Sequence, residues 1–277
     1  MKLSEMKQLV GEGQIQLTRS LGQNFLHDSN QLRKIAAAAD LKVDDKVLEI
    51  GPGLGPLTEL LVEQAGHVLA IEMDARLVEV LQKRFGDSIE LLHDDALGYL
   101  RRTSRDWREW KLVANLPYSV ASPILVELAY ALECPRRMVV TLQIEVAQRL
   151  MAAAGDPDYG LLTLLIQLQY EPKDWFKIPA SCFFPEPDVD SACVVLLRRK
   201  EPLLEASRLG SFKQIVKRGF SQRRKMMFKL LKEDWPPEPL ERAFNETAID
   251  LKARAETVTL EQFVRLTQNL SATSNHG

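Results

Sequence analysis

The stretch Lys46-Val-Leu-Glu-Ile-Gly-Pro-Gly-Leu-Gly55 decides the fold of this chain. Its first five residues are typical of a buried strand, and three glycines follow at alternate positions before a helical pattern begins at Pro56. Glycines there permit a tight turn and let a ligand approach the backbone at the carboxyl edge of a sheet. The spacing G-x-G-x-G lacks the third glycine position of the dinucleotide fingerprint, so a pyrophosphate ligand is less favoured.

Short apolar segments alternate with helical patterns on both sides of this turn. The expected strands cover residues 46–50, 68–72, 89–92, 112–114, 138–142 and 191–199. Strands that alternate with helices of about 10–15 residues predict an α/β fold, here a Rossmann-like, doubly wound parallel sheet with helices on both faces. The run 160–170 is apolar on every side, and its periodicity does not assign it to a helix or a strand.

The character of the chain changes after Glu201-Pro202, where only helical patterns remain. Thr259-Leu-Glu-Gln262 is a capping-box pattern that opens a final helix. We therefore predict two domains: residues 1–200 form the sheet domain, and residues 201–277 form a small, basic, all-helical domain.

Basic residues are concentrated in the predicted helical domain. Residues 206–232 contain nine lysines and arginines and no acid. The whole chain has 36 basic and 38 acidic residues, so the remainder carries 27 against 38, a net charge of −11. This asymmetry indicates a surface that binds a polyanion, although a solvated helix face is the alternative. The candidate residues for binding this polyanion are Arg218, Arg223, Arg224 and Lys225.

Composition excludes several classes of protein. With 45% hydrophobic and 27% charged residues among its 277, the chain is typical of a soluble globular protein. No uncharged apolar run approaches the ~20 residues of a membrane helix, and the N-terminus lacks the apolar core of a signal peptide. We therefore expect a cytoplasmic protein without membrane contact. Its three cysteines and four histidines show no metal-ligand spacing, so we expect reduced thiols and no metal.

Two acidic residues follow strands at positions that suit an adenosine-containing ligand. Glu72 ends the second expected strand, 21 residues after Gly51, where a carboxylate can accept both hydroxyls of a ribose. Asp95 follows the third strand, where it could accept from an adenine amine. The alternatives are an exposed charge at the end of a strand for Glu72 and a helix N-cap for Asp95, and without other information the N-cap is favoured.

Asn115-Leu-Pro-Tyr118 follows the fourth expected strand and is the most specific motif in the chain. It presents an amide, a backbone carbonyl freed by the proline, and an aromatic ring at the carboxyl edge of the sheet. These groups suit a planar base with an exocyclic amine, which would donate to the Asn115 side chain and the Leu116 carbonyl while Tyr118 stacks on the ring.

With these motifs in this order, the chain resembles the bacterial small-subunit (16S) ribosomal RNA adenine-N6,N6-dimethyltransferases. The resemblance extends from Leu21 to about Leu270. The motifs that carry it are Leu21-Gly-Gln-Asn-Phe-Leu26, Glu49 to Gly55, Asn115 to Tyr118, Gln143-Ile-Glu-Val-Ala147, Phe183-Phe-Pro-Glu-Pro-Asp-Val-Asp-Ser-Ala192 and Phe220-Ser-Gln-Arg-Arg-Lys225.

The resemblance implies S-adenosyl-L-methionine as the methyl donor and roles for individual residues. The residues that would hold this cofactor are Gln23, Asn24, the Leu26 backbone, Gly51, Gly53, Glu72, Asp95 and Asn115, with residues 23–26 closing over its methionine end. The residues that would hold the target adenine are Asn115, Leu116, Tyr118 and, on the other face of the ring, Phe183. The chain departs from the usual family pattern at Phe184, Glu186 and Asp188, and Asp188 replaces a lysine near the substrate mouth.

The family also implies a substrate and a cellular role. The reaction would dimethylate the N6 amines of two adjacent adenosines near the 3' end of small-subunit ribosomal RNA during ribosome biogenesis. The partner would be that RNA or an immature small subunit, and the protein would be a monomer. Three alternatives stay open: a resistance-type methylase of large-subunit RNA, a non-catalytic assembly factor on the same fold, and a DNA or small-molecule methyltransferase.

Overall fold

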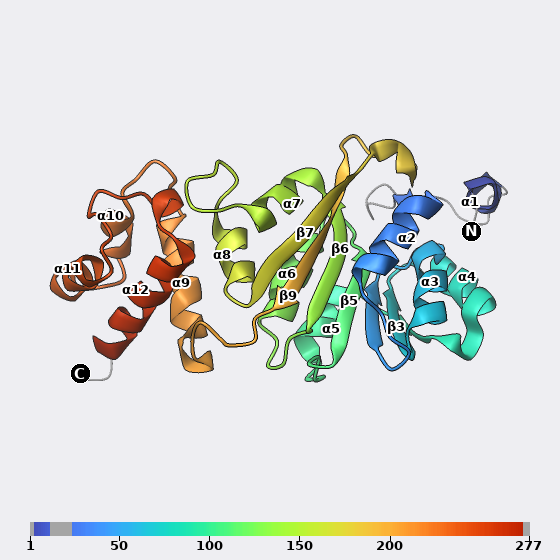
Figure 1. Cartoon of the computed structure of the whole chain (residues 1–277), viewed down its shortest axis with the longest axis horizontal. Helices are drawn as coiled ribbons and strands as arrows, with labels where there is room; N and C mark the ends of the chain where they lie inside the picture. Colours follow the sequence, from blue (N-terminus) through green and yellow to red (C-terminus); the bar gives the residue numbers. More distant parts are fainter. Residues whose placement is uncertain (1–2, 12–23, 274–277) are drawn as a thin grey trace. The chain divides into compact units, whose positions relative to one another are not determined.

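Seven strands form the main sheet of the computed structural model, which describes residues 3–11 and 24–273 (Figure 1). Five of them are parallel: β2 (Lys46–Ile50), β3 (His67–Glu72), β4 (Glu90–His93), β5 (Trp110–Asn115) and β6 (Arg137–Gln143). β9 (Ser191–Arg198) pairs antiparallel with β6, and β7 (Tyr170–Ile178) lies at the edge beside it. The predicted α/β sheet is confirmed, with every expected strand present within two residues of its expected ends.

The order of strands, β4-β3-β2-β5-β6-β9-β7, determines where a ligand can bind. From β2 the chain continues to β3 on one side, and from β5 it continues to β6 on the other side. The connections after these two neighbouring strands therefore diverge, which leaves a crevice at the carboxyl edge of the sheet.

Helices connect the strands, and several of them cover the sheet. The helices that precede β7 are α1 (Leu3–Gly11), α2 (Ser29–Ala38), α3 (Pro56–Gln64), α4 (Ala75–Phe85), α5 (Ala96–Arg102), α6 (Ala121–Ala129), α7 (Ile144–Met151) and α8 (Leu161–Gln167). α2 begins after Asp28, whose carboxylate accepts from the backbone N–H groups of Asn30 and Gln31, each at 2.9 Å. Asp28 therefore satisfies two donors that the first helical turn leaves without partners.

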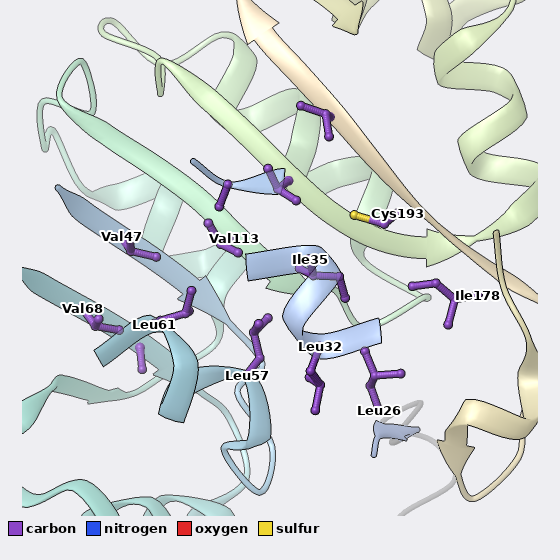
Figure 2. Close-up of a cluster of buried hydrophobic side chains, with 14 of the residues drawn as sticks. Leu26, Leu32, Ile35, Val47, Leu57, Leu61, Val68, Val113, Ile178 and Cys193 are labelled. Carbon is purple, nitrogen blue, oxygen red and sulfur yellow. The ribbon is translucent and has the colours of Figure 1, made fainter. Parts of the chain in front are cut away.

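A core of aliphatic side chains lies between two of these helices and the sheet (Figure 2). Ile35 of α2 and Leu61 of α3 are completely buried, and both belong to one cluster with Val47, Val113 and Val139 of three neighbouring strands. Because the sheet is covered, its strands read as nearly continuous apolar runs, which is why they could be predicted.

The chain divides into two compact units. One contains residues 1–147 and 171–198, and the other contains residues 148–170 together with everything from Arg199 onward. The boundary predicted near residue 201 therefore lies close to the last of three junctions, because residues 148–170 also belong with the helical part. The run 160–170 is resolved by the structure as α8 followed by the start of β7.

The second unit is built from helices around an aromatic core. Its later helices are α9 (Leu209–Gly219), α10 (Met227–Leu231), α11 (Pro237–Glu246) and α12 (Leu260–Thr273). Phe228 of α10 meets Phe244 of α11 edge to face at 5.2 Å between ring centroids. The predicted capping box is confirmed: the Gln262 N–H donates to Thr259 Oγ1 at 3.3 Å, and the Gln262 side chain accepts from the Thr259 N–H at 3.0 Å. Within the described ranges, no helix is both long and apolar enough to cross a bilayer.

Candidate active site

A cavity of about 330 Å³ opens at the carboxyl edge of the sheet. The loops that follow β2, β3, β4 and β5 line it, together with the segment 24–26. We call it the sheet-edge cavity. It lies where the connections after β2 and β5 diverge, which is the position at which open α/β sheets bind their ligands.

The glycine turn forms one wall of the cavity with backbone atoms. Gly51, Gly53 and Gly55 have φ values of 67°, 63° and 79°, in the left-handed region that disfavours other residues. At Gly53 a Cβ atom would lie 2.8 Å from the ring of Phe25, so the turn and the segment 24–26 touch without room for a side chain. The turn thus presents a bare backbone to whatever fills the cavity.

Glu72 lies buried at the end of β3, with 7% of its surface exposed, so it is not the solvated strand-end charge that was its alternative. Its carboxylate accepts from the N–H groups of Met73 and Asp74, each at 2.9 Å, and from that of Gly53 at 3.2 Å. Burial raises the pKa of Glu72 above its ordinary value, although these hydrogen bonds lower it in part. The carboxylate therefore joins the glycine turn to β3 and also lines the cavity.

Glu49 is a second buried carboxyl in the cavity wall, and it was not among the predicted site residues. Only 1% of its surface is exposed, and its Oε2 has no hydrogen-bond partner among the described residues. Burial raises its pKa to about 8, and the nearby Glu72 carboxylate adds to this. The signal was present in the sequence, because an acid inside an otherwise buried apolar strand requires a functional or structural reason.

Asp95 is the N-cap of α5, which was the alternative to a ligand-binding role, and it also lines the cavity. Its Oδ2 accepts from the backbone N–H of Gly98 at 2.8 Å, in the first turn of α5. Asp95 is exposed at the rim of the cavity, so its carboxylate is accessible to a ligand while it holds the helix.

Asn115 is held so that its amide oxygen is available. Its Nδ2 donates to the backbone carbonyl of Asn24 at 3.1 Å. Its Oδ1 is buried and has no partner within the described part of the chain. Turning the amide over would bring two oxygens together, so the contact with Asn24 fixes Oδ1 as a free acceptor in the cavity wall.

Leu116 and Tyr118 also line the cavity. The Leu116 N–H donates to the carbonyl of Thr141 at 3.0 Å, which ties the loop after β5 to β6. The Tyr118 hydroxyl lies 2.6 Å from Oγ of Ser191. Burial raises the pKa of Tyr118, so its hydroxyl is neutral at ordinary pH.

One further predicted residue, Phe183, lies elsewhere. Phe183 is 3% exposed, packs in the core cluster with Leu26 and Ile178, and is not among the described residues that line the cavity. It lies in β8 (Phe183–Phe184), which pairs antiparallel with β1 (Phe25–Leu26), so the structure brings its backbone near the cavity and turns its ring into the core. Gln23 lies outside the described residues.

The predicted RNA-binding residues differ in their surroundings within the second unit. Arg223, Arg224 and Lys225 are exposed in the loop 220–226 between α9 and α10, which we call the basic loop. Arg218, at the end of α9, instead forms ion pairs at 2.6 Å with Glu233 and Asp234. Those acids begin one residue beyond the acid-free stretch 206–232.

Comparison with known proteins identifies the family of this chain. Residues 15–272 match the model of the family described as ribosomal RNA adenine dimethylase. A match of that extent decides membership. The chain belongs to the ribosomal RNA adenine dimethylase family. Within the residues that the structure covers, no group of three or more His, Cys, Asp or Glu side chains is arranged to hold a metal ion.

Similar proteins and solved structures cover nearly the whole chain. A protein of Clostridium perfringens named ribosomal RNA small subunit methyltransferase A is 39% identical over 98% of this chain and 96% of its own. The crystal structure of the 23S ribosomal RNA methyltransferase ErmE matches at 30% identity with a TM-score of 0.69, covering 90% of this chain and all of that one. A dimethyladenosine transferase from Plasmodium falciparum shares the fold, with a TM-score of 0.79 at 24% identity over 90% and 98% of the two chains.

Family membership confirms the predicted reaction class and methyl donor. The protein is an S-adenosyl-L-methionine-dependent methyltransferase of adenine in ribosomal RNA, and the predicted Rossmann-like methyltransferase fold followed by a helical region is confirmed.

Proposed function

We propose that this enzyme dimethylates the N6 amines of two adjacent adenosines near the 3' end of small-subunit ribosomal RNA during ribosome biogenesis. The observation that carries the proposal is the free Oδ1 of Asn115 in a cavity that also holds the Glu72 carboxylate. The small subunit is favoured over the large one because a relative named for the small subunit is 39% identical, against 30% for the 23S enzyme.

The residues of the sheet-edge cavity fit the methyl donor. The glycine turn presents backbone to the cavity, and a Cβ at Gly53 would collide with the Phe25 ring. Glu72 places a carboxylate beside the turn that can accept from ribose hydroxyls. Asp95 would accept from the adenine amine of the cofactor, and Asn24 and Leu26 also line the cavity. When bound, S-adenosyl-L-methionine supplies an electrophilic methyl group on a sulfonium centre.

Asn115 and Leu116 would orient the nucleophile. The N6 lone pair of adenine is delocalised into the ring, so the amine must be held in a geometry that directs the lone pair at the methyl group. Hydrogen bonds from N6–H to Asn115 Oδ1 and to the Leu116 carbonyl would provide that geometry. Orientation of this kind contributes ~7–11 kcal/mol to a rate in favourable cases, which makes a metal or a covalent intermediate unnecessary.

Tyr118 would stack on the target base after the base leaves its helix. The corresponding role for Phe183 stays a prediction, because it requires the ring to turn out of the core in which it packs. The basic loop would hold the RNA backbone through phosphate contacts. We further propose that the enzyme acts as a cytoplasmic monomer on the RNA or on an immature small subunit.

Methylation with labelled cofactor tests this function directly. Small-subunit and large-subunit RNA are offered separately, and the products are digested to nucleosides. We expect N6,N6-dimethyladenosine from small-subunit RNA only. Labelling of large-subunit RNA alone would support the resistance-type alternative, and labelling of neither with intact cofactor binding would support a non-catalytic assembly factor.

A further inference from the structure

A buried serine contacts the far end of the ring that lines the sheet-edge cavity. Ser191 has no exposed surface, and its Oγ lies 2.6 Å from the hydroxyl of Tyr118. The two residues are 73 positions apart, Tyr118 in the loop after β5 and Ser191 as the first residue of β9. Nothing in the sequence pattern predicts this contact.

The backbone of Ser191 is fixed on both sides. It pairs with Gln143 in the β6–β9 ladder, and the preceding carbonyl, of Asp190, accepts from the N–H of Ile144 at 3.1 Å. The Asp190 carboxylate accepts from the N–H of Ala180 at 2.9 Å, which anchors the same point of the chain to the turn before β8. The sheet therefore holds the backbone from which the Ser191 hydroxyl projects.

Tyr118 needs a partner on a fixed backbone because it lies in a loop. A tyrosine ring has two side-chain torsions, and backbone position alone leaves both free to vary. A hydrogen bond at the para position restrains both torsions, because the hydroxyl is the atom farthest from the backbone. The bond also gives the fully buried Ser191 hydroxyl a hydrogen-bond partner.

We propose that Ser191 is a positioning residue for methyl transfer: it fixes the plane of the Tyr118 ring before the target base arrives. This inference rests on the proposed function, since it assumes that Tyr118 stacks on the adenine. Ser191 itself touches neither base nor cofactor. It acts through Tyr118, so that the base meets a surface that is already ordered.

Ser191→Ala tests the inference by comparing its effect on kcat with its effect on the Kd for S-adenosyl-L-methionine. A displaced stacking ring leaves the adenine amine away from the line of attack, so kcat should fall by roughly 10–100-fold. The Kd for S-adenosyl-L-methionine, measured by calorimetry, should stay within about twofold, because no cofactor-binding group changes. A general loss of structure would instead weaken cofactor binding and kcat together.

Tyr118→Phe removes the same hydrogen bond from its other end and keeps the ring. We expect it to lower kcat as Ser191→Ala does, and the double variant should be no slower than either single variant, because there is only one bond to remove. Ser191→Thr retains the hydroxyl and should recover most of the rate. Tyr118→Phe keeps the test decisive if Ser191→Ala fails to fold.

Cys193→Ala is the matched control. Cys193 lies two residues along the same strand, so its side chain is on the same face, and it is equally buried but belongs to the core cluster. Loss of its one sulfur atom should leave kcat unchanged. If Ser191→Ala keeps the parent kcat, or if its effect adds fully to that of Tyr118→Phe, the inference is wrong. If the parent enzyme does not methylate small-subunit RNA at all, the proposed function itself is wrong. That result is distinct from failure of the inference about Ser191, which requires an active parent enzyme.

Discussion

The sheet-edge cavity and the basic loop arrange their polar groups in opposite ways. In the cavity, Glu49 and Glu72 are 1% and 7% exposed, and Asn115 is fixed by a hydrogen bond to Asn24. In the basic loop, Arg223, Arg224 and Lys225 are exposed, and the Arg223 guanidinium donates to the backbone carbonyl of Pro157 at 2.8 Å. The first set is positioned by burial, and the second is accessible to solvent and ions.

This difference determines how each region can contribute to function. A buried polar group acts through its own geometry, so removing it should affect one chemical step strongly. An exposed cation acts through the summed potential of its neighbours, which salt screens. We therefore expect single substitutions to be decisive in the cavity and only combined substitutions to be decisive in the loop.

The largest expected effect comes from Asn115→Ala. It removes the free acceptor for the adenine amine, and loss of one preorganised hydrogen-bonding group typically costs about 10²–10³-fold in rate. Single-turnover methylation of small-subunit RNA measures this directly. Asn245→Ala, which removes an exposed amide from α11, is the control and should match the parent. A tenfold or smaller loss in Asn115→Ala would mean that orientation of the amine does not depend on this side chain.

The next effect tests the basic loop. Reversing Arg223, Arg224 and Lys225 to glutamate together should weaken RNA binding by about 10²-fold or more at low salt. The fall of log K with log salt should also become less steep, by about 0.9 for each phosphate that the loop no longer neutralises. Filter binding over a salt series measures both, and calorimetry should show unchanged cofactor affinity. An unchanged slope would mean that the loop is only a solvated surface.

Arg218 provides an internal control for the loop. It was predicted beside the other three cations, but its guanidinium is already paired with Glu233 and Asp234. Arg218→Ala should therefore reduce RNA affinity less than Arg224→Ala does, although both remove one positive charge. Equal losses would indicate that net charge matters and local pairing does not.

The fold could be predicted because its information is local in the sequence. Strands such as β2 and β6 are continuous apolar runs, and Gly51 to Pro56 marks the turn into α3. β7 was missed because its sequence, Tyr170-Glu-Pro-Lys-Asp-Trp-Phe-Lys-Ile178, is that of an edge strand, where charges and proline are tolerated. The inclusion of 148–170 in the second unit was missed because it depends on tertiary contacts.

The site was predictable only as a set of candidates. Spacing identified Glu72, Asp95 and Asn115 as residues at strand ends, and all three line one cavity. Their partners could not be predicted, because the bond from Asn115 to Asn24 joins positions 91 residues apart. For the same reason, the sequence does not indicate that the ring of Phe183 packs in the core.

A smaller effect is expected at the ribose position. Glu72→Ala removes acceptors for the ribose hydroxyls and should weaken cofactor binding by about 1–3 kcal/mol, or roughly 5–150-fold in Kd. Because Glu72 also holds the Gly53 N–H, the thermal midpoint should fall as well. Glu79→Ala removes an exposed carboxylate from α4 and is the matched control for charge. Calorimetry that shows parent affinity in Glu72→Ala would mean that the ribose ligand is wrongly assigned.

The smallest expected effect concerns Glu49 and the pH dependence of stability. Burial raises the pKa of this carboxyl from its ordinary value of 4.5 to about 8 in the folded protein. The folded state therefore binds a proton that the unfolded state has released between these two values. The stability that the neutral carboxyl contributes is complete below about pH 4.5 and is lost as pH rises toward about 8, with a slope of at most about 1.4 kcal/mol per pH unit.

Glu49→Gln should remove this part of the pH dependence, because a neutral amide of similar shape does not titrate. We expect the thermal midpoint of the cofactor-free parent to fall more steeply than that of Glu49→Gln between about pH 6 and about pH 8. Glu63→Gln, an exposed glutamate of α3, should follow the parent curve. Parallel curves for the parent and Glu49→Gln would show that Glu49 is ionised in the folded protein throughout this range.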